Sequence, residues 1–398
     1  MFSKKKLFSL ILAVAMIATL FVGCTGQKGT NDKQQDASTD TAGEIKIGLN
    51  YELSGNVATY GQNSVDGILM AFDEINAKGG VLGKKLVAVQ ADNKSDAAEA
   101  LNVATKLITQ DKVVAILGPA TSGNVKGATP VVMQNKIPLV SASATADDVT
   151  VDSKGVKEYI FRLCYSDSFQ GTAMANYAAK SMKAKKAVIL IDNSSDYSKG
   201  LAENFRKTFE ASGGTIVGQE AYTANDKDFN AVLTKIKGMD YDIIFLPGYY
   251  EQVGLIIKQA RDLGIDKPFL GADGYDSPKL VEIAGEKALN NVFFSNHYSS
   301  QDDNPKVVKF VEDFKAKYNK EPGAFEALGY DLGYFLASAI ERAGEATPEK
   351  IKEAMASTVD FEGVTGKLSV DENHNAIKAI TVLELKDGVQ TFNERIEP

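Results

Sequence analysis

The stretch LGPATSGNVKG, residues 117–127, contains residue types that can bind an anion. Its Gly118 and Gly123 have the spacing of a phosphate-binding loop, G-x-x-x-x-G-K-[ST]. Asn124 and Val125 stand where that loop has its lysine and its hydroxyl residue. Because the lysine that would neutralise the β- and γ-phosphates is missing, we expect no nucleotide at this loop.

Small hydroxyl residues in this stretch and in LVSASATADD, residues 139–148, suit a single carboxylate better. Ser122, Ser143 and Thr145 each follow an apolar run, where a strand is expected to end. Free backbone N–H groups at a helix start attract a negative charge. With no lysine or arginine nearby, we predict that the two segments form a nest for one carboxylate. Ordinary helix capping by serine or threonine is the alternative.

Three later segments offer an acidic residue and two tyrosines. They are DNSSDYSKG with Tyr197, PGYYEQ with Tyr249 and GADGYDS with Asp273, and each follows an apolar run. An acid and two tyrosines opposite a carboxylate nest suit a zwitterion with an apolar side chain. Asp273 could instead be an ordinary turn residue.

The residues needed for common enzyme chemistry are absent from the sequence. The chain has two histidines, His297 and His374, in polar stretches where we expect surface or hinge positions. It has no H-E-x-x-H motif, no cysteine pair at metal spacing and no G-x-S-x-G elbow. We therefore expect a binding protein without catalytic residues, metal or cofactor, and a surface hydrolase is the competing hypothesis.

The elements that must position these residues form two successive arrays. Apolar runs predict strands at 45–49, 86–90, 113–117, 139–141 and 160–163, with helices near 60–78, 95–110 and 123–135. The pattern restarts with strands at 187–191, 215–218, 243–246, 269–270 and 292–295 and helices near 168–182, 197–212, 228–237 and 251–264. Helices near 304–318, 324–343 and 348–357 and strands near 367–370 and 377–385 follow. This alternation predicts an α/β fold of two doubly wound parallel-sheet lobes, with the cleft between them as the binding site.

The amino terminus predicts export. Three lysines precede an apolar segment, Leu7–Val22, that is too short to span a membrane and is typical of a signal peptide, residues 1–23. The ending LFVGC resembles the lipobox of bacterial lipoproteins, in which Cys24 receives a lipid, and a plain secreted protein is the alternative. Residues 24–43 are polar and without periodicity, which predicts a flexible tether.

Cys164, the other cysteine, lies between apolar residues and is expected in the core.

Composition excludes one class of partner. The 398 residues are 44% hydrophobic, which is enough for two domains with sizeable cores. A formal net charge of -8 gives no general attraction for polyanions, so we expect no nucleic-acid partner.

Several segments together resemble the leucine/isoleucine/valine-binding proteins, type I periplasmic-binding-fold receptors of ABC importers. They include YELSGNVATYGQNSVDGILMAFDEINAKGG, IPLVSASAT, SSDYSKGLAENF, PGYYEQVGLIIKQARDLG and GAFEALGYDLGY, in order between about residues 44 and 390. The resemblance implies two discontinuous lobes joined by three hinge strands. The expected boundaries are 44–163 with 297–375 for lobe 1, and 164–296 with 376–398 for lobe 2.

The resemblance also implies roles for single residues. Ser122, the Ser143 carbonyl and Thr145 match the residues that hold the carboxylate and ammonium of an amino acid, and Asp273 matches the acidic partner of the ammonium. Tyr60, Tyr197, Tyr249 and Phe325 match residues of the cleft and pocket wall. Thr121 replaces a cysteine of some relatives, and Asp273 is one methylene shorter than the usual glutamate.

The resemblance favours a monomer on the outer face of the cell membrane, held by its lipid anchor beside an ABC permease. The expected ligand is a branched-chain or related aliphatic amino acid. A receptor of the same fold for a short amide, urea or an aromatic acid is the alternative.

Overall fold

The computed structural model describes residues 43–398. The predictions made for the signal peptide, for lipidation of Cys24 and for nearly all of the tether fall outside the described residues. Within residues 43–398, no helix is both long enough and apolar enough to cross a membrane.

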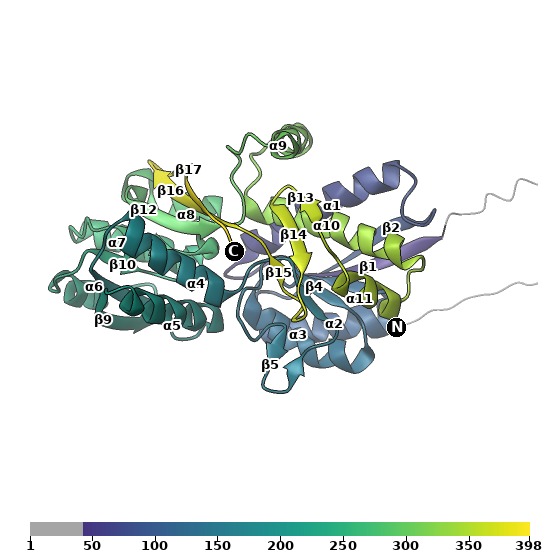
Figure 1. Ribbon diagram of the computed structural model, residues 1–398, viewed down its shortest axis with the longest axis horizontal. Helices are drawn as coiled ribbons and strands as arrows, with labels where there is room; N and C mark the ends of the chain where they lie inside the picture. The colour runs from purple at the N-terminus through teal and green to yellow at the C-terminus, as the bar shows by residue number, and fades with distance from the viewer. Residues whose placement is uncertain (1–42) are drawn as a thin grey trace, which may run out of the picture. The chain divides into compact units, whose positions relative to one another are not determined.

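Lobe 1 is built on five parallel strands in the order β2-β1-β3-β4-β7 (Figure 1). The strands are β1 Glu44–Tyr51, β2 Lys85–Asp92, β3 Ala115–Leu117, β4 Leu139–Ser141 and β7 Ile160–Arg162. The helices on this sheet are α1 Ala58–Ala77, α2 Ala97–Lys106, α3 Ser122–Asn135, α10 Ala324–Ala343 and α11 Pro348–Ala356. In β3, Ala115 and Leu117 pack with residues of α1 and α10, whereas Ile116 packs with α2 and α3. Because successive side chains of a strand point to opposite faces, an unbroken apolar run needs helices on both.

Lobe 2 is built on seven strands in the order β17-β16-β12-β11-β10-β8-β9. The strands are β8 Lys186–Asp192, β9 Thr215–Tyr222, β10 Ile243–Phe245, β11 Phe269–Gly271, β12 Val292–Asn296, β16 Ile380–Lys386 and β17 Val389–Ile396. The helices are α4 Asp167–Asn176, α5 Asp196–Ala211, α6 Asn230–Lys237, α7 Tyr250–Asp262 and α8 Pro278–Ala284. Ile189 packs with α4 and α5, and its neighbour Val188 with α6 and α7. Only β16 and β17 run antiparallel to their neighbours.

Three segments connect the two sheets: one follows β7, one follows β12 and one precedes β16. The second leads to α9 Pro305–Tyr318, and the third leaves a small sheet of β13 Phe361–Gly363, β14 Gly366–Val370 and β15 Ala376–Ile377. The predicted fold class, two doubly wound lobes joined by three hinge segments, is confirmed.

Local differences from the sequence prediction occur at element ends and in short strands. The helices predicted near 95–110 and 168–182 close with π-helical turns, Leu107–Asp111 and Tyr177–Ser181. The strand predicted near 377–385 is two strands, β15 and β16, because the chain crosses between the lobes there. The hairpin of β5 Val151–Asp152 and β6 Gly155–Val156 was not predicted, since two-residue strands carry no periodic signal.

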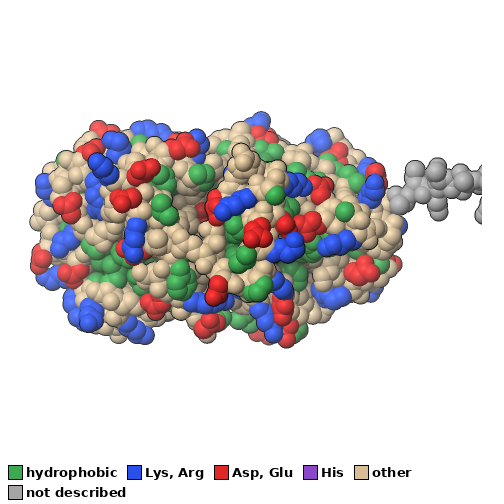
Figure 2. Space-filling view, turned by 90° about the horizontal axis from the view of Figure 1, so that it is seen from above, with side chains coloured by type: hydrophobic (Ala, Val, Ile, Leu, Met, Phe, Trp, Pro, Cys, Tyr) green, Lys and Arg blue, Asp and Glu red, His purple; other side chains and the backbone are tan. Residues whose placement is uncertain are grey.

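The surface carries both signs of charge. On the face drawn in Figure 2, lysine and arginine side chains lie among aspartates and glutamates, without a large area of one sign. Exposed ion pairs such as Lys309–Asp313 and Lys258–Asp262 account for part of this mixture.

Candidate functional site

A cavity lies where strands of both sheets end. Lobe 1 and its helix α10 contribute Tyr60, Ala120, Thr121, Ser122, Ser143 and Phe325 to its wall, and lobe 2 contributes Tyr197, Tyr249, Asp273 and Gly274. About 240 Å³ between these residues is not filled by protein atoms, and this volume includes open solvent. Most of these residues follow the carboxyl ends of β3, β4, β8, β10 and β11, where doubly wound sheets hold their ligands. The structure thus brings together every predicted site residue of its described part except Thr145.

The backbone N–H groups after β3 do not form the open nest that we predicted. The carboxylate of Glu52, which is fully buried, accepts hydrogen bonds from the N–H groups of Ala120 (2.9 Å) and Thr121 (3.0 Å). It also accepts from Thr121 Oγ1 and Asn124 Nδ2, both at 2.8 Å. This part of the nest is therefore filled by a carboxylate of the chain itself.

Ser122 and Ser143 still face the cavity. Ser122 is the first residue of α3, and its Oγ accepts a hydrogen bond of 3.0 Å from the N–H of Ala146. Ser143 Oγ donates to the carbonyl of Ala120 at 2.8 Å, which ties the loop after β4 to the loop after β3. These bonds fix Ser122 at the N-terminus of α3, where an anion is favoured, and hold Ser143 in the loop beside it.

Thr145 lies behind the cavity wall. Its side chain is fully buried, and its carbonyl accepts hydrogen bonds of 2.7 Å from the N–H of Asp167 and from Arg162 Nη1. Its Oγ1 has no hydrogen-bond partner within residues 43–398. The two backbone contacts hold Thr145 toward the start of α4, and Thr145 is not among the residues that line the cavity.

Asp273 is the acidic group of the cavity wall. It begins the 3₁₀ turn Asp273–Tyr275 after β11 and is 4% exposed. Its Oδ1 accepts a hydrogen bond of 2.7 Å from Tyr197 OH, and its Oδ2 lies 3.0 Å from His297 Nε2. Burial and the nearby Asp273 raise the pKa of Tyr197 well above its ordinary value, so this hydroxyl remains a donor. A cation in the cavity would meet a carboxylate already fixed in place.

Aromatic rings form the apolar part of the wall. Tyr60 and Phe325 are stacked with their centroids 4.2 Å apart, and Tyr249 stacks on Tyr197 at 5.1 Å. The hydroxyl of Tyr60 donates to the carbonyl of Gly274 in the other lobe. Such a wall suits a hydrocarbon side chain next to the polar groups.

Sequence reasoning missed Asp167, a buried carboxyl group beside this site. It starts α4, is fully buried, and neither carboxylate oxygen has a partner in the described chain. Burial raises the pKa of Asp167 well above its ordinary value, and the nearby Asp273 adds to the shift. Its sequence context, SDSF, resembles an ordinary helix start, so no local signal distinguishes it.

His297 is buried at 3% exposure directly after β12, so it lies at the start of the second hinge crossing and not on the surface. Cys164 is buried as predicted, and its Sγ donates to the carbonyl of Ala144. In the described part of the chain, no group of three or more histidine, cysteine, aspartate or glutamate side chains could hold a metal ion.

The sequence profile described as "Periplasmic binding protein" matches residues 44–390. The chain is 34% identical over 331 residues to the leucine-, isoleucine-, valine-, threonine- and alanine-binding protein of Pseudomonas aeruginosa, covering 83% of this chain and 87% of that protein. It is 30% identical over 332 residues to the leucine-specific-binding protein of Salmonella typhimurium. This match covers 83% of this chain and 88% of that protein. The chain belongs to the Leu/Ile/Val-binding family of periplasmic binding proteins.

Solved structures of the Leu/Ile/Val-binding family agree with this assignment. The branched-chain amino acid transporter substrate-binding protein LivJ of Streptococcus pneumoniae, crystallised with isoleucine, is 43% identical, with a TM-score of 0.84 and coverage of 89% of this chain and all of that chain. The leucine-binding protein LivK of Thermotoga maritima is 37% identical, also with a TM-score of 0.84. The match covers 89% of this chain and 99% of LivK. This family member is therefore an extracytoplasmic substrate-binding protein of a branched-chain amino acid ABC transporter and not an enzyme.

Proposed function

We propose that the protein captures one free aliphatic amino acid, most simply a branched-chain one, in the cavity between its lobes and delivers it to an ABC permease. The observation that carries the proposal is the division of the cavity wall. Ser122 of lobe 1 offers a hydroxyl donor at the N-terminus of α3, with Ser143 beside it on the cavity wall, whereas Asp273 of lobe 2 offers a carboxylate. A zwitterion matches both, and the rings of Tyr60, Tyr249 and Phe325 suit its side chain.

Capture in this proposal is a closing movement of the two lobes. We keep the lobe boundaries 44–163 with 297–375 and 164–296 with 376–398 as part of the proposal. A ligand that contacts both lobes stabilises the closed arrangement by its difference in affinity for the open and closed forms. The permease can then distinguish a loaded receptor from an empty one.

The assignment of roles follows from the contacts of each residue. Ser122 would bind the α-carboxylate, because its hydroxyl can donate while accepting from Ala146 N–H. Asp273 would bind the ammonium, with Tyr197 holding the carboxylate in place. Thr145 would take part only if the loop after β4 turns its hydroxyl forward, and Asp167 is a second carboxyl group within the same polar region.

A thermal-shift screen tests the function. Purified residues 43–398 are heated with each of the common amino acids and, in parallel, with acetamide, urea and benzoate. A ligand at about 100 times its dissociation constant adds roughly 2.7 kcal/mol, which is an easily measured shift. We expect leucine, isoleucine or valine to give the largest shift. A shift only with the amides or with benzoate would replace this proposal by the alternative ligand class.

We also propose that lipidated Cys24 anchors the protein on the outer face of the cell membrane and that residues 24–43 act as the tether. The apolar segment Leu7–Val22 followed by Gly23-Cys24 supports the anchor. An anchored receptor stays near its permease, which raises its effective concentration there.

A further inference from the structure

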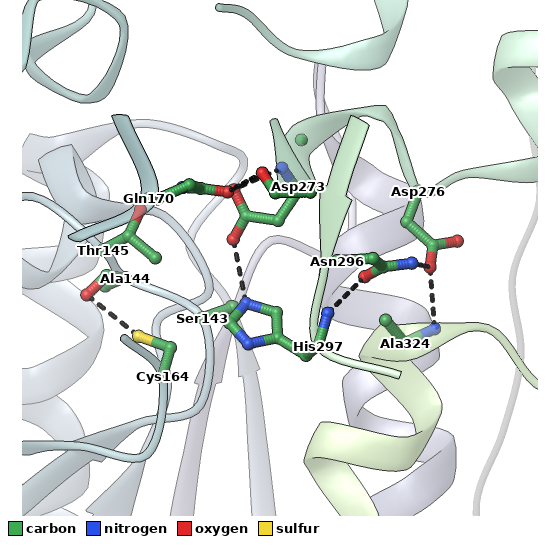
Figure 3. A network of polar contacts seen from close by, with 12 residues as sticks. Ser143, Ala144, Thr145, Cys164, Gln170, Asp273, Asp276, Asn296, His297 and Ala324 are labelled. Carbon is green, nitrogen blue, oxygen red and sulfur yellow. Dashed lines mark hydrogen bonds and ion pairs between the residues drawn. The ribbon is translucent and has the colours of Figure 1, made fainter. Parts of the chain in front are cut away.

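His297 is paired with the acidic residue of the cavity wall. Its Nε2 lies 3.0 Å from Asp273 Oδ2, and both side chains are buried, with exposed fractions of 1% and 5% (Figure 3). The imidazole ring stacks on Tyr165 with a centroid distance of 3.9 Å and an interplanar angle of 16°. The contact with Asp273 is thus made by a buried imidazole that is stacked on a neighbouring ring.

The contact defines the protonation state of His297. A carboxylate only accepts hydrogen bonds, so the proton of a neutral imidazole must be on Nε2. Nδ1 is buried and has no hydrogen-bond partner in residues 43–398, so a second proton there would have nowhere to donate. Burial lowers the pKa of His297, and the bond to Asp273 opposes that shift only in part.

We propose that His297 is a positioning residue for the ligand: as a neutral donor it holds the Asp273 carboxylate with its negative charge available for the ligand's ammonium, and as a cation it cancels that charge. This inference rests on the proposed function. Tyr197 holds the other carboxylate oxygen, and it cannot supply a positive charge. His297 is therefore the group within the described site that can switch the charge which the ammonium meets.

The other charged and titratable groups around His297 do not replace it in this role. Lys378, from the crossing before β16, is buried and donates to Thr365 Oγ1, and its positive charge further disfavours a charged imidazole. From the crossing after β7 come Tyr165, Cys164 and Asp167, and burial raises the pKa of all three. None of these three groups can become positively charged as the pH falls. Among the groups named here, His297 is therefore the one that would gain a positive charge on acidification, and its burial moves this change to lower pH.

The sign of the effect follows from linkage. A bound ammonium next to Asp273 opposes a proton on His297, so ligand binding and His297 protonation exclude each other. Affinity for an amino acid should fall as the pH is lowered below about 6.5, the ordinary pKa of histidine, because burial moves the protonation of His297 to lower pH. The free amino acid stays a zwitterion in this range.

Isothermal titration calorimetry of the best amino acid from the screen, between about pH 7 and pH 5, tests the proposal. The wild type should bind at least about threefold more weakly at the lower pH. His297→Gln keeps a donor for Asp273 but cannot be protonated, so it should bind somewhat more weakly at neutral pH and lose the pH dependence. His374→Gln is the matched control, because His374 stacks on Phe161 away from the cavity wall, and it should follow the wild type. Equal pH profiles of wild type and His297→Gln would overturn the proposal.

A second measurement needs no bound ligand and no substitution of His297 itself. The chain has only two histidines, so ¹⁵N-labelled imidazoles of the wild type can be assigned with His374→Gln. At neutral pH we expect His297 to be neutral with its proton on Nε2. A proton on Nδ1, or a charged imidazole, would disprove the positioning role. If this spectrum is as expected but no amino acid binds, the proposed function fails and the His297–Asp273 pairing remains.

Discussion

Nζ of Lys126 lies 2.6 Å from Oδ2 of Asp196, an ion pair that joins helix α3 of lobe 1 to helix α5 of lobe 2. Each partner adjoins the cavity wall, since Lys126 lies one turn beyond Ser122 and Asp196 precedes Tyr197. Lys126 is also 2.6 Å from Asp148, which belongs to the same lobe. In the proposed closing movement, Asp148 would hold the lysine in place while the lobes are apart, and the bond to Asp196 would form on closure.

Lys126→Met should weaken amino-acid binding by about two- to fivefold. A partly exposed ion pair stabilises the protein only slightly, but here the stabilisation acts on the closed state alone. The loss should appear mainly as faster release, and it should shrink at high salt, which screens the pair in the wild type. Stopped-flow measurement of dissociation at low and high salt checks both points.

Lys106→Met provides a matched control for that substitution. Lys106 also forms an ion pair at 2.6 Å, but its partner Asp111 lies in the same lobe. Lys106→Met should therefore leave the rate of amino-acid release unchanged. Equal effects of the two substitutions would mean that closure does not depend on the Lys126–Asp196 pair.

Asp273→Ala should weaken binding of the best amino acid by about tenfold or more, since a charge-assisted hydrogen bond is worth roughly 1.5–3 kcal/mol. The fold should survive. Tyr197 and His297 each lose their bond to the Asp273 carboxylate, but they do so beside the cavity, where a water molecule can replace it. Calorimetry measures the affinity, and circular dichroism checks the fold. Unchanged affinity would exclude Asp273 as the ammonium partner.

Glu52→Ala should lower the free energy of unfolding by about 3 kcal/mol, because it leaves buried donors of Ala120, Thr121 and Asn124 without an acceptor. Urea unfolding measures the change. Glu282→Ala removes an exposed glutamate that is paired with Lys279, and it should cost less than about 0.5 kcal/mol. If Glu52→Ala is as mild as this control, the carboxylate does not hold the loop after β3 in place.

The parts of the site that the sequence predicts are those with a local signal. A strand followed by small hydroxyl residues at a helix start describes Ser122 and Ser143, and both line the cavity. For Asp273 the residues alone left an ordinary turn residue as the alternative, and the family resemblance assigned it to the site, where it lines the cavity wall. Tyr60 and Phe325 were assigned to the site from the family resemblance alone. Their ring contact depends on the packing of α1 against α10, and the sequence around either residue does not show that packing.

The parts that the sequence does not predict depend on partners far apart in the chain. Glu52 reaches amides 68 residues later, and whether those amides bind it or a ligand depends on the β1–β3 register. Thr145 was assigned to the wall with Ser143, yet bonds from Asp167 and Arg162 to its carbonyl hold it behind the wall. The spacing of two residues between Ser143 and Thr145 does not reveal these contacts, so it cannot show which of the two side chains faces the cavity.

Cys24→Ser should release the protein from membranes if the lipobox interpretation is correct. A lipid chain contributes about 0.8 kcal/mol of membrane binding per buried methylene, and the substituted chain has no thiol to carry it. Fractionation of cells into membrane and soluble parts measures the change. Cys164→Ser is the control, since Cys164 is buried in the body and should not affect anchoring. A Cys24→Ser protein that still sediments with membranes after mild washing would contradict the anchor.

Asp167 and Asp196 should affect the pH dependence of stability with opposite signs. Burial raises the pKa of Asp167, so the folded protein holds this proton more tightly than the unfolded chain, and stability is lost as the pH rises through the folded-state pKa. Lys126 and Lys199 lower the pKa of Asp196 to about 2, so its contribution is present at neutral pH and is lost as the pH falls toward that value.

Substitution to asparagine separates these two effects in the ligand-free protein. Asp167→Asn should be more stable than the wild type at about pH 8, with a difference that shrinks toward about pH 4. Asp196→Asn should be slightly less stable than the wild type at neutral pH, with a difference that shrinks on acidification. Urea unfolding across this range measures both differences. A destabilised Asp167→Asn protein at about pH 8 would show that the Asp167 carboxylate is ionised and stabilised within the folded protein, because only then does removing its charge cost stability.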